Sequence, residues 1–185
     1  MIRGLIDPSE VDEIVIGGYP DADLAGSRTS ARSVSGGVAG LLGPTTWVPL
    51  DWSGKRQTAT STSTSEAETI SLCKLAKDSV MPLQSLWSAI FGRTVRAKYF
   101  EDNTATVSII KTGYSVALRH LAKHHRISLS FANDATGEDN DSSIEYIPTG
   151  LQKGDILTKP LARVAFEHAC EINGIILHPL KDAKK

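Results

Sequence analysis

Acidic residues at four points along the chain constrain its fold, because each lies where a strand is predicted to end or a helix to begin. These residues are Asp21, Glu68, Asp102 and Asp155. In an α/β domain such positions project side chains into one shared crevice at the edge of the sheet. Two carboxylates brought close together there repel each other by about 1 kcal/mol in water and by about 4 kcal/mol at the dielectric of a protein surface. The pattern therefore predicts a bound divalent cation.

The chemistry of these ligands narrows the function. Oxygen-only ligands favour hard ions such as Mg²⁺ or Mn²⁺. Such ions act on phosphate esters by activating a water molecule and by neutralising the leaving oxygen. Any one acid taken alone is more commonly a solvated surface group. All four together favour a metal-dependent enzyme that cleaves phosphodiesters.

Length, charge and cysteine content limit the classes of protein to which the chain can belong. The 185 residues fit one domain of ordinary size. A formal net charge of −1 gives no overall attraction to nucleic acid, so binding to a polyanion must come from local basic stretches. Cys73 and Cys170 lie in helix-like apolar patterns without metal-ligand spacing, which predicts buried, reduced thiols and an intracellular, cytoplasmic location. No apolar run is long enough to cross a bilayer.

The chain is predicted to form one domain with two short flexible ends. Residues 1–12 are polar and lack periodicity, and residues 177–185 are charged, so both segments are expected to be loosely held. Residues 13–176 are expected to form the domain, which is predicted to be monomeric when isolated.

Strand patterns dominate the first part of this domain. Residues 13–19 form an apolar run that ends near two glycines. Residues 34–42 alternate loosely with glycines, and residues 45–52 are rich in β-branched and aromatic side chains, which predicts two more strands. The three segments together indicate an antiparallel meander. Two later strands are predicted at residues 95–100 and 144–147.

Helical patterns lie between and after the strands. Ser63, with Glu66 three residues later, is a capping signature, so a helix is predicted to begin there. On the wheel of this helix Glu68 lies at the edge of the buried arc, whereas Glu66 points toward solvent. Pro82 is predicted to break the helix and to start a second one that runs to Phe91. Further helices are predicted over residues 103–111 and 164–173. The stretch 118–133 is basic and then apolar, and Ile127, Leu129 and Phe131 in it are compatible with a helix.

Six blocks of sequence occur in a distinctive order along the chain. They are Gly-Tyr-Pro-Asp-Ala-Asp-Leu-Ala-Gly, Arg-Ser-Val-Ser-Gly, Thr-Ser-Glu-Ala-Glu, Glu-Asp-Asn-Thr-Ala, Tyr-Ile-Pro-Thr and Gly-Asp-Ile-Leu-Thr-Lys-Pro-Leu. Over about residues 16–175 the chain resembles the ribonuclease H domain that closes the polyprotein of Ty1/copia-type retrotransposons. The resemblance implies an α/β, ribonuclease H-like fold. Its five-stranded mixed sheet would have three antiparallel and then two parallel strands, flanked by helices on both faces.

The resemblance also implies roles for the acids. Asp21 matches the family's first-strand aspartate, Glu68 its first-helix glutamate, Asp102 its fourth-strand aspartate, and Asp155 the aspartate that opens the last helical segment. Periodicity cannot choose between Asp21 and Asp23, which face the same side of a strand, and only the resemblance favours Asp21. The four acids are implied to be catalytic and to hold two Mg²⁺ ions, with Mn²⁺ as a substitute.

The implied activity is cleavage of the RNA strand of RNA–DNA hybrids, by a domain tethered to a reverse transcriptase and carried within retrotransposon particles. Recognition of the RNA strand requires contacts to its 2′-hydroxyl groups. The candidate substrate-binding residues are Thr62, Ser63, Asn103, Arg119, Lys123 and His124. His124 and His125 are interpreted as part of a basic helix face rather than as proton carriers that assist product release.

Some positions depart from the family's usual residues. The chain has Leu24 where the family usually has Trp, and Pro20 where it has Ser or Thr. The four acids are kept, so an active enzyme is expected. Two alternatives stay open: an inactive domain of the same fold that binds hybrids or serves the structure of the polyprotein, and an enzyme of this fold that cleaves DNA. Glu101 is interpreted as a neighbour of the site without a role.

Overall fold

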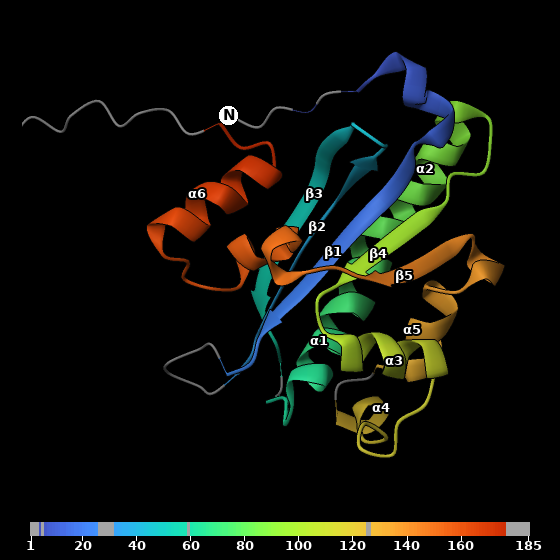
Figure 1. Ribbon diagram of the computed structural model, residues 1–185. Coiled ribbons are helices and arrows are strands. Elements are labelled where there is room, and N and C mark those ends of the chain that lie inside the picture. Colours follow the sequence, from blue (N-terminus) through green and yellow to red (C-terminus); the bar gives the residue numbers. More distant parts are fainter. Residues whose placement is uncertain (1–3, 5, 26–31, 59, 125–126, 177–185) are drawn as a thin grey trace, which may run out of the picture.

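A mixed sheet of five strands forms the centre of the computed structural model, which describes residues 4, 6–25, 32–58, 60–124 and 127–176. The strand order is β3-β2-β1-β4-β5 (Figure 1). The strands are β1 (Val15–Asp23), β2 (Val34–Leu42), β3 (Trp47–Arg56), β4 (Ala97–Glu101) and β5 (Ser142–Tyr146). β2 pairs antiparallel with β1 and β3, whereas β4 runs parallel to both β1 and β5. The expected ribonuclease H-like sheet, with three antiparallel and then two parallel strands, is confirmed.

Helices cover both faces of this sheet (Figure 1). One face carries α1, α2, α3 and α5, and α1 packs across β1 and β2. On the other face the 3-10 helix η5 packs against β1 and β2, and α6 packs against η5. The bounds are α1 (Thr64–Leu75), α2 (Met81–Phe91), α3 (Thr104–Thr112), α4 (Leu121–His124), α5 (Leu129–Ala135), η3 (Glu138–Asn140), η4 (Thr149–Leu151), η5 (Lys153–Leu157) and α6 (Arg163–Ile172). The main core lies between the sheet and α1, where Ile16, Leu41, Leu72 and Tyr99 are fully buried.

A π-helical turn, η2 (Ala76–Val80), separates α1 from α2, so the α-helix is interrupted before Pro82 without the chain leaving the helical conformation. Proline lacks a backbone N–H, and its ring crowds the carbonyl four residues earlier. In the wider π turn the N–H of Met81 donates to the carbonyl oxygen of Ala76, which relieves this conflict. The predicted second helix from Pro82 to Phe91 is confirmed, since Pro82 lies in the first turn of α2, whereas the transition before it is a π turn with helical backbone angles.

The stretch 118–133, part of which is compatible with a helix, contains two short helices, α4 and the start of α5. Ser128 has an extended backbone between α4 and α5, and its hydroxyl accepts a hydrogen bond from the N–H of Phe131. A serine in this conformation is an N-cap, which begins a new helix rather than continuing an old one. The helix expected around Leu129 and Phe131 is therefore confirmed as α5, whereas Ile127 lies before its cap.

The amino-terminal segment is attached to the sheet by Glu10. This residue lies in the 3-10 helix η1 (Pro8–Glu13) and is buried. Its carboxylate accepts hydrogen bonds from the N–H groups of Thr45 and Thr46 and from the Thr45 hydroxyl. These bonds tie part of the segment expected to be flexible to the turn between β2 and β3. Residues 177–185 lie outside the described residues, and the domain boundaries stay a prediction.

Both cysteines are buried and unpaired, as predicted. Burial raises the pKa of the Cys73 thiol to about 12, so this group is protonated at neutral pH. Among the helices in the described ranges, none is both long and apolar enough to cross a membrane.

Candidate metal centre

Asp21 is buried within β1, near the end of the sheet at which β4 also stops. Its partner on β2 is Gly36. The hydroxyl of Ser71 on α1 lies 2.7 Å from the carbonyl oxygen of Asp21 and 2.8 Å from that of Gly36, and it can donate to either. This contact holds α1 against the strand pair and thereby helps to set the position of Glu68, three residues earlier on the helix.

Carboxylates from three elements meet at this end of the sheet. Asp21 comes from β1, Glu68 from the first turns of α1, and Asp102 from the residue after β4. One carboxylate oxygen of each residue lies within 4.8 Å of the other two. Glu68 and Asp102 line an open cavity of about 500 Å³ beside this group, whereas Asp21 lies behind them and is fully buried. The structure thus brings together three of the four acids predicted from the sequence.

Glu68 is a buried carboxyl group that lacks a hydrogen-bond partner on one of its oxygens. Its Oε2 atom is buried and has no hydrogen-bond partner in the described part of the chain. Burial, followed by the negative charges of Glu101, Asp21 and Asp102, raises the pKa of Glu68 to about 10. A buried carboxylate is costly unless it is protonated or binds a cation. The unpartnered oxygen of Glu68 therefore fits a ligand for a divalent metal ion.

Asp155 is connected to the centre through Lys159. The Lys159 ammonium lies 2.7 Å from Oδ1 of Asp155 and 3.1 Å from Oδ1 of Asp21. Burial raises the pKa of Asp155 to about 6, although its contact with Lys159 opposes the shift. Among the described residues, the group of closely spaced carboxylate oxygens does not include Asp155. Its link to the other acids is therefore a shared counter-charge.

Lys159 is a candidate functional residue that sequence analysis missed. Burial by itself lowers its pKa, but the charge of Asp21 and the contacts with Asp155 raise it above the ordinary value. Lys159 is therefore charged at neutral pH and offsets part of the acidic charge. The hydroxyl of Thr158 donates to the other carboxylate oxygen of Asp21. In the sequence, only the position of Thr158 and Lys159 in the same block as Asp155 could have pointed to them. That Lys159 lies close to Asp21 depends on tertiary packing, which no local pattern shows.

The close approach of η5 to β1 requires glycine at position 154. A Cβ atom on Gly154 would lie 2.8 Å from the Cβ of Asp21 and 2.8 Å from the carbonyl oxygen of Tyr19. Non-bonded carbon contacts are normally near 3.5–4.0 Å. Only glycine lets η5 come close enough to place Lys159 and Asp155 beside Asp21.

Glu101 is more closely involved than its interpretation as a neighbour implied. It is fully buried, and its Oε1 atom accepts a hydrogen bond from the N–H of Asn103 at 3.2 Å. Burial raises the pKa of Glu101 to about 8, although the bond from Asn103 opposes the shift. Among the nearby charges, that of Glu101 has the largest effect on Glu68. Glu101 thus supports the turn that carries Asp102 and is a second buried carboxyl group beside the centre.

Glu66 is buried, which contradicts its predicted solvent-facing position. The predicted cap is confirmed, since the Ser63 hydroxyl accepts the N–H of Glu66. The Glu66 carboxylate accepts hydrogen bonds from the N–H and hydroxyl of Thr62 at 2.7 and 2.6 Å, and it lies 3.1 Å from Nε2 of His120. A helical wheel treats α1 in isolation, so it could not show that the segment before α4 lies against this turn.

The candidate substrate-binding residues lie on two sides of the centre. Asn103 lines the cavity, and its Oδ1 accepts the N–H groups of Ala105 and Thr106. Its amide nitrogen is therefore the group left to donate to a ligand. The hydroxyls of Thr62 and Ser63 take part in the cap of α1.

Arg119, Lys123 and His124 are exposed on or next to α4. His120 joins this basic segment to Glu66, and the rings of His120 and His124 are 6.0 Å apart. His125 lies outside the described residues.

The fold and the centre define a ribonuclease H-like domain with carboxylates from β1, α1 and the end of β4 gathered at one edge of the sheet. No protein-family model matches the chain. The chain is 28% identical over 167 residues to the retrovirus-related Pol polyprotein from transposon RE2 of Arabidopsis thaliana, and 27% identical over 164 residues to that from transposon RE1. Each match covers 87% of this chain, which spans only about 10% of the length of either relative. The resemblance to retrotransposon polyproteins is confirmed.

Two solved structures are also similar. The N-terminal ribonuclease H domain of a Mycobacterium tuberculosis protein, solved as a fusion with maltose-binding protein, gives a TM-score of 0.49 at 17% identity, covering 85% of this chain and 97% of that one. LC11-RNase H1, isolated from compost by a metagenomic approach, gives a TM-score of 0.49 at 16% identity. This match covers 85% of this chain and 91% of that one. The fold assignment depends on the strand order of the sheet itself.

Proposed function

We propose that this chain is a ribonuclease H domain that cleaves the RNA strand of RNA–DNA hybrids with Mg²⁺, or Mn²⁺ in its place. The observation that carries this proposal is the meeting of three carboxylates from three separate elements, with oxygens within 4.8 Å of one another. The five-stranded sheet and the similarity to transposon Pol polyproteins support the same function. Tethering to a reverse transcriptase and a cytoplasmic location within retrotransposon particles are part of the proposal.

Asp21, Glu68 and Asp102 would hold a divalent cation. Their donor atoms are all oxygens, which are the ligands that Mg²⁺ prefers. Bound ions of this kind lower the pKa of a water molecule and neutralise a leaving oxygen. We include Asp155 as the fourth acid of a two-ion site. Asp155 and Asp21 both form an ion pair with Lys159, which offsets part of their negative charge.

The surrounding side chains would bind and orient the substrate. The amide nitrogen of Asn103 can donate to a 2′-hydroxyl group of the RNA strand, since it lines the same cavity as Asp102. Arg119, Lys123 and His124 would contact phosphates from the exposed basic segment. Thr62 and Ser63 are also candidate substrate contacts. Because their hydroxyls already form hydrogen bonds in the cap of α1, only part of their hydrogen-bonding capacity is left for the substrate.

A cleavage assay with a labelled hybrid tests the proposal. The wild-type chain should shorten the RNA strand in Mg²⁺ and should be inactive in EDTA. Asp21→Asn and Asp102→Asn should each lower the rate by roughly a hundredfold or more, because each removes a charged ligand, and even changes to groups that only support a metal ligand typically cost about 10–100-fold. Asp139→Asn is the matched control, since Asp139 is an exposed carboxylate in η3, before the start of β5.

A folded wild-type chain that binds hybrids but does not cleave them in Mg²⁺ or Mn²⁺ would contradict the enzymatic proposal and favour the inactive binding domain. Parallel assays on duplex DNA and duplex RNA would separate a hybrid-specific enzyme from one that cleaves DNA.

A further inference from the structure

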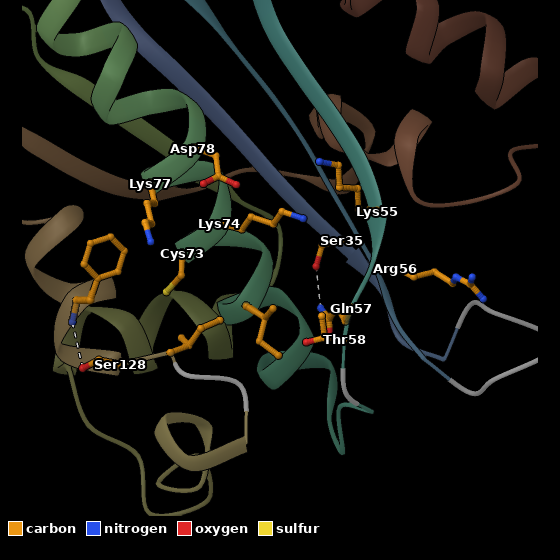
Figure 2. Close-up of a pocket in the computed structure, with 13 residues that line it drawn as sticks. Ser35, Lys55, Arg56, Gln57, Thr58, Cys73, Lys74, Lys77, Asp78 and Ser128 are labelled. Carbon is orange, nitrogen blue, oxygen red and sulfur yellow. Dashed lines mark hydrogen bonds between the residues drawn. The ribbon is translucent and has the colours of Figure 1, made fainter.

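A second cavity, of about 560 Å³, lies along the outer side of α1 between the end of β3 and the start of α5 (Figure 2). Ile70, Cys73 and Lys74 are its lining residues on α1. At about 100° per residue, these three positions lie on the side of the helix away from Glu68. The cavity is therefore distinct from the acidic centre.

Cationic side chains dominate the rim of this cavity. Lys55 and Arg56 come from β3, Lys74 from α1 and Lys77 from η2, whereas Asp78 is the one carboxylate among the lining residues that the structure describes. In Figure 2, Lys55 and Lys74 point toward each other, and Arg56 points outward. The ion pairs found in the described ranges involve none of these four cations. In a chain of net charge −1 this is a local positive excess, which attracts polyanions.

The floor of the cavity is apolar. Ile70 and Cys73 are buried, and Ile127 and Phe131 are half-buried at its wall. Cavities of roughly 300–1,000 Å³ with apolar walls and a few polar groups are typical of small-ligand sites. An aromatic ring next to clustered cations is also the combination by which proteins bind single-stranded nucleic acid, because a base stacks on the ring while its phosphate meets the positive charge.

We propose that this cavity binds an unpaired nucleotide within a polynucleotide strand. The base would lie on Ile127 and Phe131, and the phosphate would lie among Lys55, Lys74 and Lys77. A free nucleotide has the same chemistry, but a strand is the better match. Four cations exceed the charge of one phosphodiester, and the outward direction of Arg56 suits a neighbouring phosphate.

The inferred contact would hold a single-stranded stretch next to the hybrid. This inference depends on the proposed function in one respect, namely that the ligand is a nucleic acid. The two proposals can fail separately, because binding to the cavity requires neither metal nor cleavage.

Binding of a fluorescent 12-nucleotide DNA strand to the full chain in EDTA, over a range of salt concentrations, tests the inference. For single strands, each lost phosphate contact reduces the slope of log affinity against log salt concentration by about 0.7. The double variant Lys74→Ala/Lys77→Ala should therefore reduce the slope by about 1.4 and should weaken binding at low salt by roughly tenfold. The control Arg96→Ala/Lys98→Ala removes two cations at the start of β4 and should leave both values unchanged.

The apolar contact is tested by Phe131→Leu, which keeps most of the side-chain volume. Loss of stacking should weaken binding by roughly fivefold or more. Competition identifies the ligand: dAMP should displace the strand at far lower concentration than inorganic phosphate. If inorganic phosphate displaced the strand at the same concentration as dAMP, the proposed contact with the base would be wrong. Unchanged affinity and salt slope in a folded lysine double variant would overturn the site, even if hybrid cleavage were intact.

Discussion

In the metal-free protein, Glu68→Gln should stabilise the fold at neutral pH. Burial and the charges of Glu101, Asp21 and Asp102 raise the pKa of Glu68 from 4.5 to about 10. Because the folded pKa is the higher one, the folded state binds more protons, and stability falls as the pH rises from 4.5 toward 10. At about 1.4 kcal/mol per pH unit, the loss between pH 4.5 and pH 7 is about 3 kcal/mol. Glutamine cannot ionise, so the variant avoids this loss.

Thermal unfolding in EDTA at pH 5, 7 and 9 measures the effect. For a chain of this length about 1 kcal/mol shifts the melting temperature by roughly 2–4 °C, so Glu68→Gln should unfold roughly 6–12 °C above wild type at pH 7 and close to wild type at pH 5. Mg²⁺ should raise the melting temperature of wild type more than that of the variant, because the variant lacks a ligand. Glu138→Gln, at an exposed carboxylate, is the control. Parallel dependence of melting temperature on pH in wild type and Glu68→Gln would refute the reasoning.

Three further substitutions test other contacts. Lys159→Met should destabilise the fold by about 2 kcal/mol in EDTA and less in Mg²⁺, because it removes a partly exposed counter-charge; equal losses in both buffers would contradict its role. Gly154→Ala should cost about 1–3 kcal/mol in urea unfolding through crowding against β1, whereas Gly150→Ala, whose Cβ would meet nothing within 4 Å, should not; coincident midpoints would count against the packing argument. His120→Ala should speed amide hydrogen exchange in α4, since it removes the contact with Glu66, and unchanged exchange would show that other contacts hold the segment.

The sheet and the first helix could be predicted because their signals are local. Strand β2 was predicted with its observed bounds, Val34–Leu42, since alternating apolar residues and glycines are already visible in the sequence. The cap at Ser63 was predicted for the same reason, because it needs only two residues three positions apart. Asp21, by contrast, could be chosen over Asp23 only through the resemblance, and the structure then places Asp21 within the group of close carboxylates.

The contacts that sequence analysis missed all depend on segments far apart in the chain. Lys159 and Asp21 are separated by 138 positions, and no local pattern shows that η5 packs against β1. The burial of Glu66 depends in the same way on His120, 54 positions later. The π turn at η2 was missed because the rule applied to Pro82 considers an ideal α-helix and not the wider turn that accommodates it.

Lys159 has a consequence for the charge balance of the centre. An ammonium group of the chain itself lies between two aspartates, so part of their repulsion is offset without any ion from solution. Under the proposed function, a divalent ion held by Asp21 would compete with this ammonium group for the same carboxylate. Such competition would disfavour monovalent ions, whose single charge equals that of the lysine, and would favour ions of double charge.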